Sequence, residues 1–156
     1  MGTMQTVTSS TGPEGRVSAD RMAALHIHLA DPEGAMRASL HALVQRVAGA
    51  RGAAIADANG LPIASTFPDR DDMRLASALA TMIARASHLV LDSLEGDRFH
   101  MVTLEGTGNV ILAVDVSEGI GSLILIMDPI GDIAGARREI LRTAMEVTTI
   151  LDLDVV

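Results

Sequence analysis

The sequence contains no cysteine, no lysine and almost no aromatic side chains. Without cysteine the chain can form no disulfide bond, no thiolate nucleophile and no thiolate metal site. Without lysine it offers no Schiff-base amine and no P-loop lysine, because all 12 basic residues are arginines. Its only aromatic residues of the Phe, Tyr and Trp type are two phenylalanines. We therefore predict an aliphatic core and a surface poorly suited to stacking on bases or sugars.

Negative charge dominates the chain, with a formal net charge of −8 at pH 7. This balance argues against non-specific binding to nucleic acid and against anionic membranes. No segment reaches the roughly 18 consecutive apolar residues of a membrane span. The N-terminus lacks the charged start and apolar stretch of a secretory signal. We expect a cytoplasmic protein without a nucleic-acid or membrane partner.

The length of 156 residues favours one domain, and the 48% of hydrophobic residues suffices for a core. Residues 1–20 are rich in Thr, Ser and Gly without any period, which predicts a flexible N-terminal tail. Residues 21–30 are ambiguous, because their apolar positions fit either a short strand or a helical turn. We expect residues 31–156 to form the folded domain.

A first helix is predicted to begin at Asp31. Asp31 suits the N-cap, Pro32 the first helical position, and Glu33 the positive end of the helix dipole. Apolar residues follow at helical spacing, namely Met36, Leu40, Leu43, Val44 and Val47. Gly49 is expected to end this helix.

The dipeptide Asn59-Gly60 separates two apolar runs and predicts a β-hairpin. A two-residue type I′ turn needs positive φ at both central positions, which Asn and Gly tolerate best. Pro62 has no N–H to donate, so the second strand of this hairpin is expected at a sheet edge.

A second helix is predicted from Asp69 to about Ser93. One broad apolar face consists of Leu75, Leu79, Met82, Ile83, Ala86, Leu89 and Val90. Beside it runs a strip of small residues, Ala76, Ala80, Ala84 and Ser87, and the remaining side carries Arg74, Thr81, Arg85 and His88. The strip permits two arrangements: close packing of the helix on its own sheet, or close packing against a second helix.

Three further strands are expected at 99–104, 109–116 and 122–127, followed by a helix from about Ile133 to Leu151. In the first strand, Phe99, Met101 and Thr103 are predicted to share one side. The other two runs are apolar on both faces, which is typical of central strands. The order of helix, two strands, helix, three strands and helix indicates a layered α/β fold with an antiparallel five-stranded sheet.

Three stretches, "GARGAAIADANGLPIAS", "LASALATMIARA" and "NVILAVDVSEGIGSLILI", carry a resemblance to a known family. Over about residues 31–151 the chain resembles the roadblock family of dynein light chains and bacterial GTPase regulators of the MglB type. The resemblance implies a profilin-like or longin-like roadblock fold. In that fold the first and third helices cover one face of the sheet, and one long second helix covers the other.

The same resemblance implies a homodimer in which the third strands pair edge to edge and the second helices lie side by side. The implied interface residues are Ala76, Ala80, Ala84, Arg98, Phe99, His100, Met101, Val102, Thr103 and Leu104. The resemblance therefore favours packing of the alanine strip against the same helix of a second copy. In that arrangement Ala80→Glu would split the dimer. Pairing would also protect the apolar 99–104 strand, which is an aggregation risk as a free edge.

Family members bind small Ras-like GTPases, usually on the face formed by the paired second helices. The implied partner-binding residues here are Arg70, Arg74, Thr81, Arg85 and His88. We therefore expect a non-enzymatic, homodimeric module that regulates a small GTPase as an activator or scaffold. The alternatives are a small-ligand sensory domain and a structural subunit of a motor or cytoskeletal complex.

Motifs with direct chemistry are weak, and we expect no catalytic residue, metal or cofactor. His26 and His28 with Asp31 have ligand types at strand spacing, but no nearby cluster completes a metal site. Gly106 and Gly108 lack a third glycine and a following helix, so they predict a hairpin turn rather than a dinucleotide loop.

Overall fold

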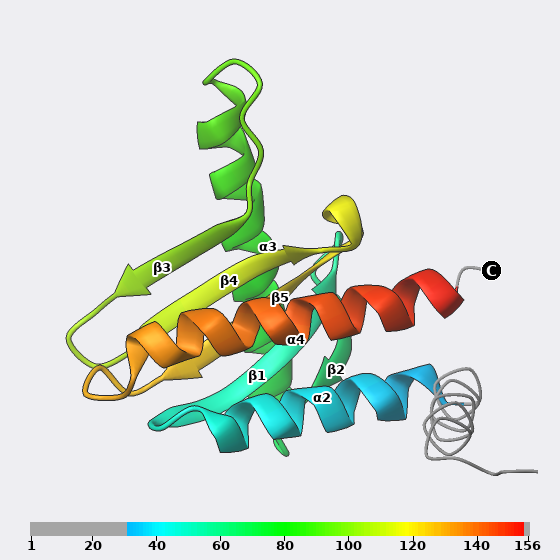
Figure 1. The fold of residues 1–156 in the computed structure, drawn as a ribbon, viewed down its shortest axis with the longest axis vertical. Helices are drawn as coiled ribbons and strands as arrows, with labels where there is room; N and C mark the ends of the chain where they lie inside the picture. Colours follow the sequence, from blue (N-terminus) through cyan, green and yellow to red (C-terminus); the bar gives the residue numbers. More distant parts are fainter. Residues whose placement is uncertain (1–30, 155–156) are drawn as a thin grey trace, which may run out of the picture.

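The computed structural model describes residues 31–154, and the predictions for residues 1–20 and 21–30 lie outside this part (Figure 1). The elements are α2 (Pro32–Arg46), β1 (Ala50–Asp57), β2 (Pro62–Ser65), α3 (Arg70–Asp92), β3 (Met101–Glu105), β4 (Val110–Val116), the 3₁₀ turn η1 (Ser117–Gly119), β5 (Gly121–Met127) and α4 (Ile133–Asp154). Their order confirms the element order predicted from the sequence.

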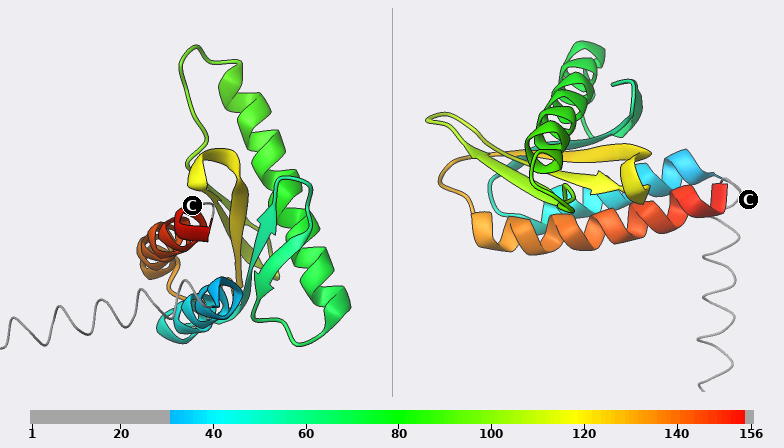
Figure 2. Two further views of the ribbon diagram at one scale, coloured as in Figure 1. Left: turned by 90° about the vertical axis from the view of Figure 1, so that its right-hand side faces the viewer. Right: turned by 90° about the horizontal axis from the view of Figure 1, so that it is seen from above.

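The five strands form one antiparallel sheet with the order β2-β1-β5-β4-β3. The long helix α3 covers one face of this sheet, and α2 and α4 cover the other, as Figures 1 and 2 show. The predicted fold class is confirmed, and β2 with Pro62 lies at an edge as expected. The other edge is β3.

The two faces of the sheet differ in the size of their buried side chains. Large aliphatic residues fill the face under α2 and α4, among them Leu40, Leu43, Ile55, Leu112, Leu125 and Ile140. The layer of buried side chains between α3 and the sheet consists mostly of small residues. At its centre are Ala54, Ala56, Ala76, Ala80 and Ile124. Small residues on both sides of this contact let α3 lie close to the sheet.

Both predicted helix starts are confirmed by capping hydrogen bonds. The Asp31 carboxylate accepts a hydrogen bond from the Gly34 N–H at 2.9 Å. The Asp69 carboxylate accepts one from the Asp71 N–H at 2.7 Å. Each bond satisfies an N–H group that lacks a partner within its own helix.

The hairpin around Asn59-Gly60 is confirmed, but the predicted type I′ turn is wrong. Gly60 has φ +85°, whereas Asn59 keeps a negative φ. The Asp57 carboxylate accepts hydrogen bonds from the Asn59 N–H at 2.8 Å and the Leu61 N–H at 3.0 Å. The Asp57 N–H also bonds to the Leu61 carbonyl, so the loop holds three residues and ends with a left-handed glycine.

Candidate functional site

The outer side of α3, away from the sheet, carries a row of exposed large apolar side chains. Leu75, Met82 and Leu89 are 60%, 59% and 76% exposed. Their seven-residue spacing returns each to nearly the same side of the helix. Val90 is also exposed beside them, and we call these four residues the α3 stripe. Monomeric proteins rarely leave such a contiguous patch uncovered, so it indicates an interaction surface.

The edge strand β3 lies next to this stripe. Val102 and Leu104 pair with Ala113 and Ile111 of β4, so their side chains point to the α3 face of the sheet. A groove of about 340 Å³ between α3 and β3 is lined by Ala86, Ser87, Val90, Leu91, Phe99, Met101 and Val102. The α3 stripe therefore meets the β3 edge at Val90, across a groove with a largely apolar lining.

The alanine strip does not belong to this surface, which corrects the expectation that it contacts a second helix. Ala76, Ala80 and Ala84 are 1%, 0% and 8% exposed. Ala76 and Ala80 pack on Ala54, Ala56 and Ile124 of the chain's own sheet. The small residues of β1 accept the small side of α3, with Leu79 and Ile83 packed beside it, and the residues of the α3 stripe turn outward.

The segment before β3 also differs from the prediction. The strand begins at Met101, so Arg98, Phe99 and His100 precede it and are not strand residues. Phe99 is buried, and its ring packs edge-on against the ring of His88 on α3, with centroids 5.2 Å apart. Met101 instead pairs with Val114, which faces α2 and α4. Phe99 and Met101 therefore do not share one side, and Phe99 is already largely buried within the single chain.

The five predicted partner-binding residues have different environments. Arg70 and Arg74 are exposed near the start of α3, and within residues 31–154 they form no ion pair. Thr81 is buried and donates a hydrogen bond to the Asp57 carbonyl at 3.1 Å, so its assignment to a docking surface is wrong. Arg85 donates to the Ala58 carbonyl at 2.8 Å and ties α3 to the hairpin. Of this set, Arg70 and Arg74 remain the side chains most available to a partner.

Asp115 is a residue that sequence reasoning overlooked, although a carboxylate within the apolar strand β4 was a usable signal. It lies 3.9 Å from Nε2 of His88 and lines a small polar pocket of about 130 Å³ with Asp57, Arg85 and His88. Burial raises the pKa of Asp115 above the ordinary 3.8, while His88, the Gly119 N–H and Arg98 oppose this shift. Together, His88, Phe99 and Asp115 connect α3, the start of β3 and β4.

The raised pKa of Asp115 predicts a pH-dependent loss of stability. The folded chain binds the proton of the Asp115 carboxyl more tightly than the unfolded chain does. The protonated carboxyl therefore contributes its full amount to the free energy of unfolding below pH 3.8, and this contribution is lost as the pH rises through the raised pKa. Asp115→Asn keeps an acceptor for Gly119 and removes the buried charge. Its unfolding free energy should exceed that of the unmodified chain at pH 7 and match it at acid pH, measured by urea titration. The matched control is Asp97→Asn, because Asp97 is exposed.

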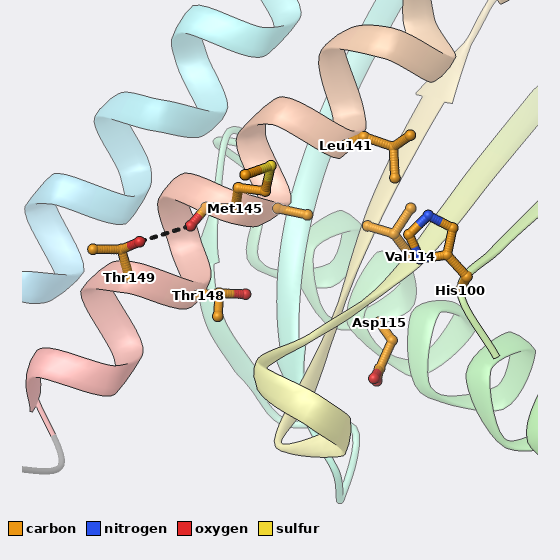
Figure 3. A pocket seen from close by; sticks show the side chains of 8 residues that line it. His100, Val114, Asp115, Leu141, Met145, Thr148 and Thr149 are labelled. Atoms are coloured by element: carbon orange, nitrogen blue, oxygen red, sulfur yellow. Dashed lines mark hydrogen bonds between the residues drawn. The ribbon is translucent and has the colours of Figure 1, made fainter. Parts of the chain in front are cut away.

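A second groove lies on the opposite face, between α4 and β4 (Figure 3). It has a volume of about 490 Å³ and is lined by His100, Val114, Asp115, Leu141, Ala144, Met145, Thr148 and Thr149. Thr148 accepts a hydrogen bond from the Ser117 N–H, and Thr149 donates one to the Met145 carbonyl. The volume lies within the range of small-molecule sites.

Within residues 31–154, no group of three or more histidine or carboxylate side chains is arranged to hold a metal ion. None of the helices in the described part of the chain combines the length and the apolarity needed to cross a bilayer.

Comparison with known proteins decides the family. The family model for the Roadblock/LC7 domain matches residues 36–127. The chain belongs to the Roadblock/LC7 family. The match begins inside α2 and continues through the last strand, β5. Among curated proteins, no significant match to this Roadblock/LC7 chain is found.

Solved structures share this Roadblock/LC7 fold at low sequence identity. A Roadblock/LC7 domain from Streptomyces avermitilis is 20% identical with a TM-score of 0.69, covering 74% of this chain and 96% of that one. MglB from Myxococcus xanthus is 20% identical with a TM-score of 0.68, covering 76% and 89%. The gliding protein MglB from Thermus thermophilus is 19% identical with a TM-score of 0.67, covering 76% and 90%. These likenesses establish the fold.

Proposed function

We propose that this chain is a non-enzymatic homodimer that binds and regulates a small Ras-like GTPase, as an activator or a scaffold. The observation that carries the proposal is the exposed apolar α3 stripe together with the adjoining, unpaired β3 edge. Such a surface fits a regulatory module that works through protein contacts.

A two-fold axis beside β3 accounts for both parts of the surface at once. Two copies of β3 pair antiparallel, which satisfies the unpaired N–H and C=O groups of each edge. The same axis brings the two α3 helices side by side, so that each stripe covers the other. A structure described as MglB with a tetrameric arrangement is consistent with self-assembly in a structural relative.

The GTPase assignment rests on the family resemblance, and the exposed arginines of α3 suit it. Arg70 and Arg74 are exposed at the start of α3. Guanidinium groups bind carboxylates and phosphates in a planar, bidentate geometry. As an activator, the module would stimulate GTP hydrolysis by positioning the GTPase's own catalytic loops.

Charge reversal of the two exposed arginines tests the GTPase contact. Arg70→Glu together with Arg74→Glu should weaken binding of a Ras-like GTPase from the same organism at least about tenfold, because reversed charges at a rim repel the partner. The matched control reverses Arg137 and Arg138, which are exposed on α4 at the other face. Calorimetry measures the binding of the double variant and of the control to the GTPase, loaded either with a non-hydrolysable nucleoside triphosphate or with the diphosphate. A stable dimer that binds neither nucleotide state contradicts the proposal.

The groove between α4 and β4 favours a second candidate, a small-ligand sensory domain. Its mostly apolar lining with a few polar groups is typical of sites for small organic molecules. A ligand that raises the melting temperature in the absence of any GTPase would support this candidate.

A further inference from the structure

A small polar pocket lies where the second half of α3 crosses the ends of β1, β5 and β4. It has a volume of about 130 Å³, and its lining includes Thr81, Arg85 and His88 of α3, Asp115 of β4 and Ser122 of β5. We propose that this pocket binds a small zwitterion, such as a free amino acid of the size of glycine. The proposal needs neither the dimer nor the GTPase contact, so its test is independent of both.

The helix wall of the pocket is polar on the side of α3 that faces the sheet. Thr81, Arg85 and His88 follow one another at three- and four-residue spacing, which places them on one side of the helix. Thr81 is buried and bonds to the Asp57 carbonyl, and His88 lies 3.9 Å from Asp115. The first half of the same helix presents alanines to the sheet instead. Polar side chains in such a contact are costly without polar partners, which indicates a polar occupant.

The floor of the pocket comes from a row of paired residues on the α3 face of the sheet. Ser122 of β5 pairs with Ala56 of β1 on one side and with Asp115 of β4 on the other. Ala56 packs against α3, so the side chains of Ser122 and Asp115 point to the same face. Ser122 is only 2% exposed and lines the pocket. The floor therefore offers a hydroxyl beside a carboxylate, away from bulk water.

Asp115 is held where its charge costs stability, which is typical of residues kept for binding. Burial raises the pKa of its carboxyl above the ordinary 3.8. Nε2 of His88 is too distant for a hydrogen bond, and the Gly119 N–H supplies one. A carboxylate accepts up to about four hydrogen bonds. An ammonium group in the pocket would supply further donors and favour the ionised form of Asp115.

Arg85 supplies the opposite charge at the mouth of the pocket. Its side chain is exposed, and Nη2 donates a hydrogen bond to the Ala58 carbonyl at 2.8 Å, which holds the guanidinium at the β1–β2 hairpin. A guanidinium has five N–H donors, so others remain for a carboxylate. Because β5 separates β1 from β4, the hairpin and Asp115 lie about 10 Å apart across the sheet. A glycine-sized zwitterion with a hydrogen bond of about 2.9 Å at each end bridges a gap of this order.

The turn η1 closes the pocket with a strained backbone that the rest of the chain holds in place. Ser117 and Glu118 have φ values of +52° and +53°, a region that non-glycine residues rarely adopt. The Ser117 N–H donates to Oγ1 of Thr148, and its hydroxyl donates to the Asp152 carboxylate. Gly119 of the same turn lines the pocket. Backbone strain that the surrounding structure maintains is concentrated at binding sites.

The volume of the pocket limits the size of its occupant. At about 30 Å³ for each water molecule, 130 Å³ holds roughly four or five non-hydrogen atoms. Glycine has this size, whereas the side chain of a larger amino acid would extend through the mouth past Arg85. For a ligand this small we expect a dissociation constant of about 1 mM.

Titration of the isotope-labelled full chain with glycine at pH 7, followed by nuclear magnetic resonance, tests the proposal. We expect saturable shifts of the amide signals of Gly119, Gly121 and Ser122. Acetate and methylamine, which each carry only one of the two charges, should bind at least about tenfold more weakly. The absence of saturation by glycine up to about 100 mM would overturn the proposal. Acetate or methylamine that binds as tightly as glycine would overturn it as well.

Two substitutions test the two ends of the pocket separately. Arg85→Gln and Asp115→Asn should each weaken glycine binding at least about tenfold, because each removes one of the paired charges. The matched controls are Arg137→Gln and Asp97→Asn, which are exposed outside the pocket and should bind glycine like the unmodified chain. Asp115→Asn is expected to be the more stable chain at pH 7, so unfolding does not account for its weaker binding. Glycine affinity that survives either pocket substitution unchanged contradicts the proposal.

Discussion

Met82→Glu is expected to convert the proposed dimer into a folded monomer. Met82 is the central residue of the α3 stripe and is more than half exposed in a single chain, so the substitution leaves the monomer fold intact. In the dimer, each copy would place an unpaired carboxylate in the buried contact between the two helices. We expect the dissociation constant to rise at least about 100-fold, which corresponds to roughly 2.8 kcal/mol.

Sedimentation equilibrium of both chains measures this change, and urea unfolding at low concentration checks the monomer fold. The matched control is Met145→Glu, because Met145 is also largely exposed but lies on α4 at the other face of the sheet. The control should keep the dissociation constant of the unmodified chain. Equal dissociation constants for Met82→Glu and the unmodified chain would show that the stripe is not part of the dimer contact.

Ala80→Glu is expected to unfold the chain rather than split a folded dimer. Ala80 is fully buried between α3 and the sheet, where Ala54, Ala56 and Ile124 leave no space for a larger side chain. The new carboxylate would lie in an apolar contact without a partner, which combines overpacking with a buried unpaired charge. We expect a loss of at least about 4 kcal/mol in the free energy of unfolding, a large share of the total for a domain of this size.

Urea unfolding monitored by circular dichroism tests this expectation. The matched control is Ala78→Glu, two residues earlier on the same helix, where the alanine is exposed. It should change the unfolding free energy by less than about 0.5 kcal/mol. A folded Ala80→Glu monomer with the stability of the unmodified chain would mean that the alanine strip faces a second helix after all.

The fold was predictable because its local signals agree with one another. Asp31 and Asp69 are caps in both the sequence and the structure, and Pro62 lies on an edge strand as its missing N–H requires. The turn type was not predictable from Asn59-Gly60 alone. The Asp57 carboxylate holds the N–H groups of Asn59 and Leu61 and selects a three-residue loop instead.

The orientation of α3 was the part that sequence periodicity could not decide. Both sides of this helix are apolar, one with small residues and one with large ones. A large apolar face ordinarily turns inward, but β1 presents Ala54 and Ala56, which fit the small side. The structure therefore buries Ala80 and exposes Met82. Phe99 was misplaced for a related reason, because its contact with His88 depends on a loop whose course no periodicity records.

The mass of the unmodified chain in solution tests the central claim most directly. Light scattering coupled to gel filtration at micromolar concentration measures it without any substitution. The account predicts twice the chain mass of 16.3 kDa, because the α3 stripe and the β3 edge are covered by a second copy. A stable mass of 16.3 kDa under these conditions would contradict it, since that surface would then remain open to water.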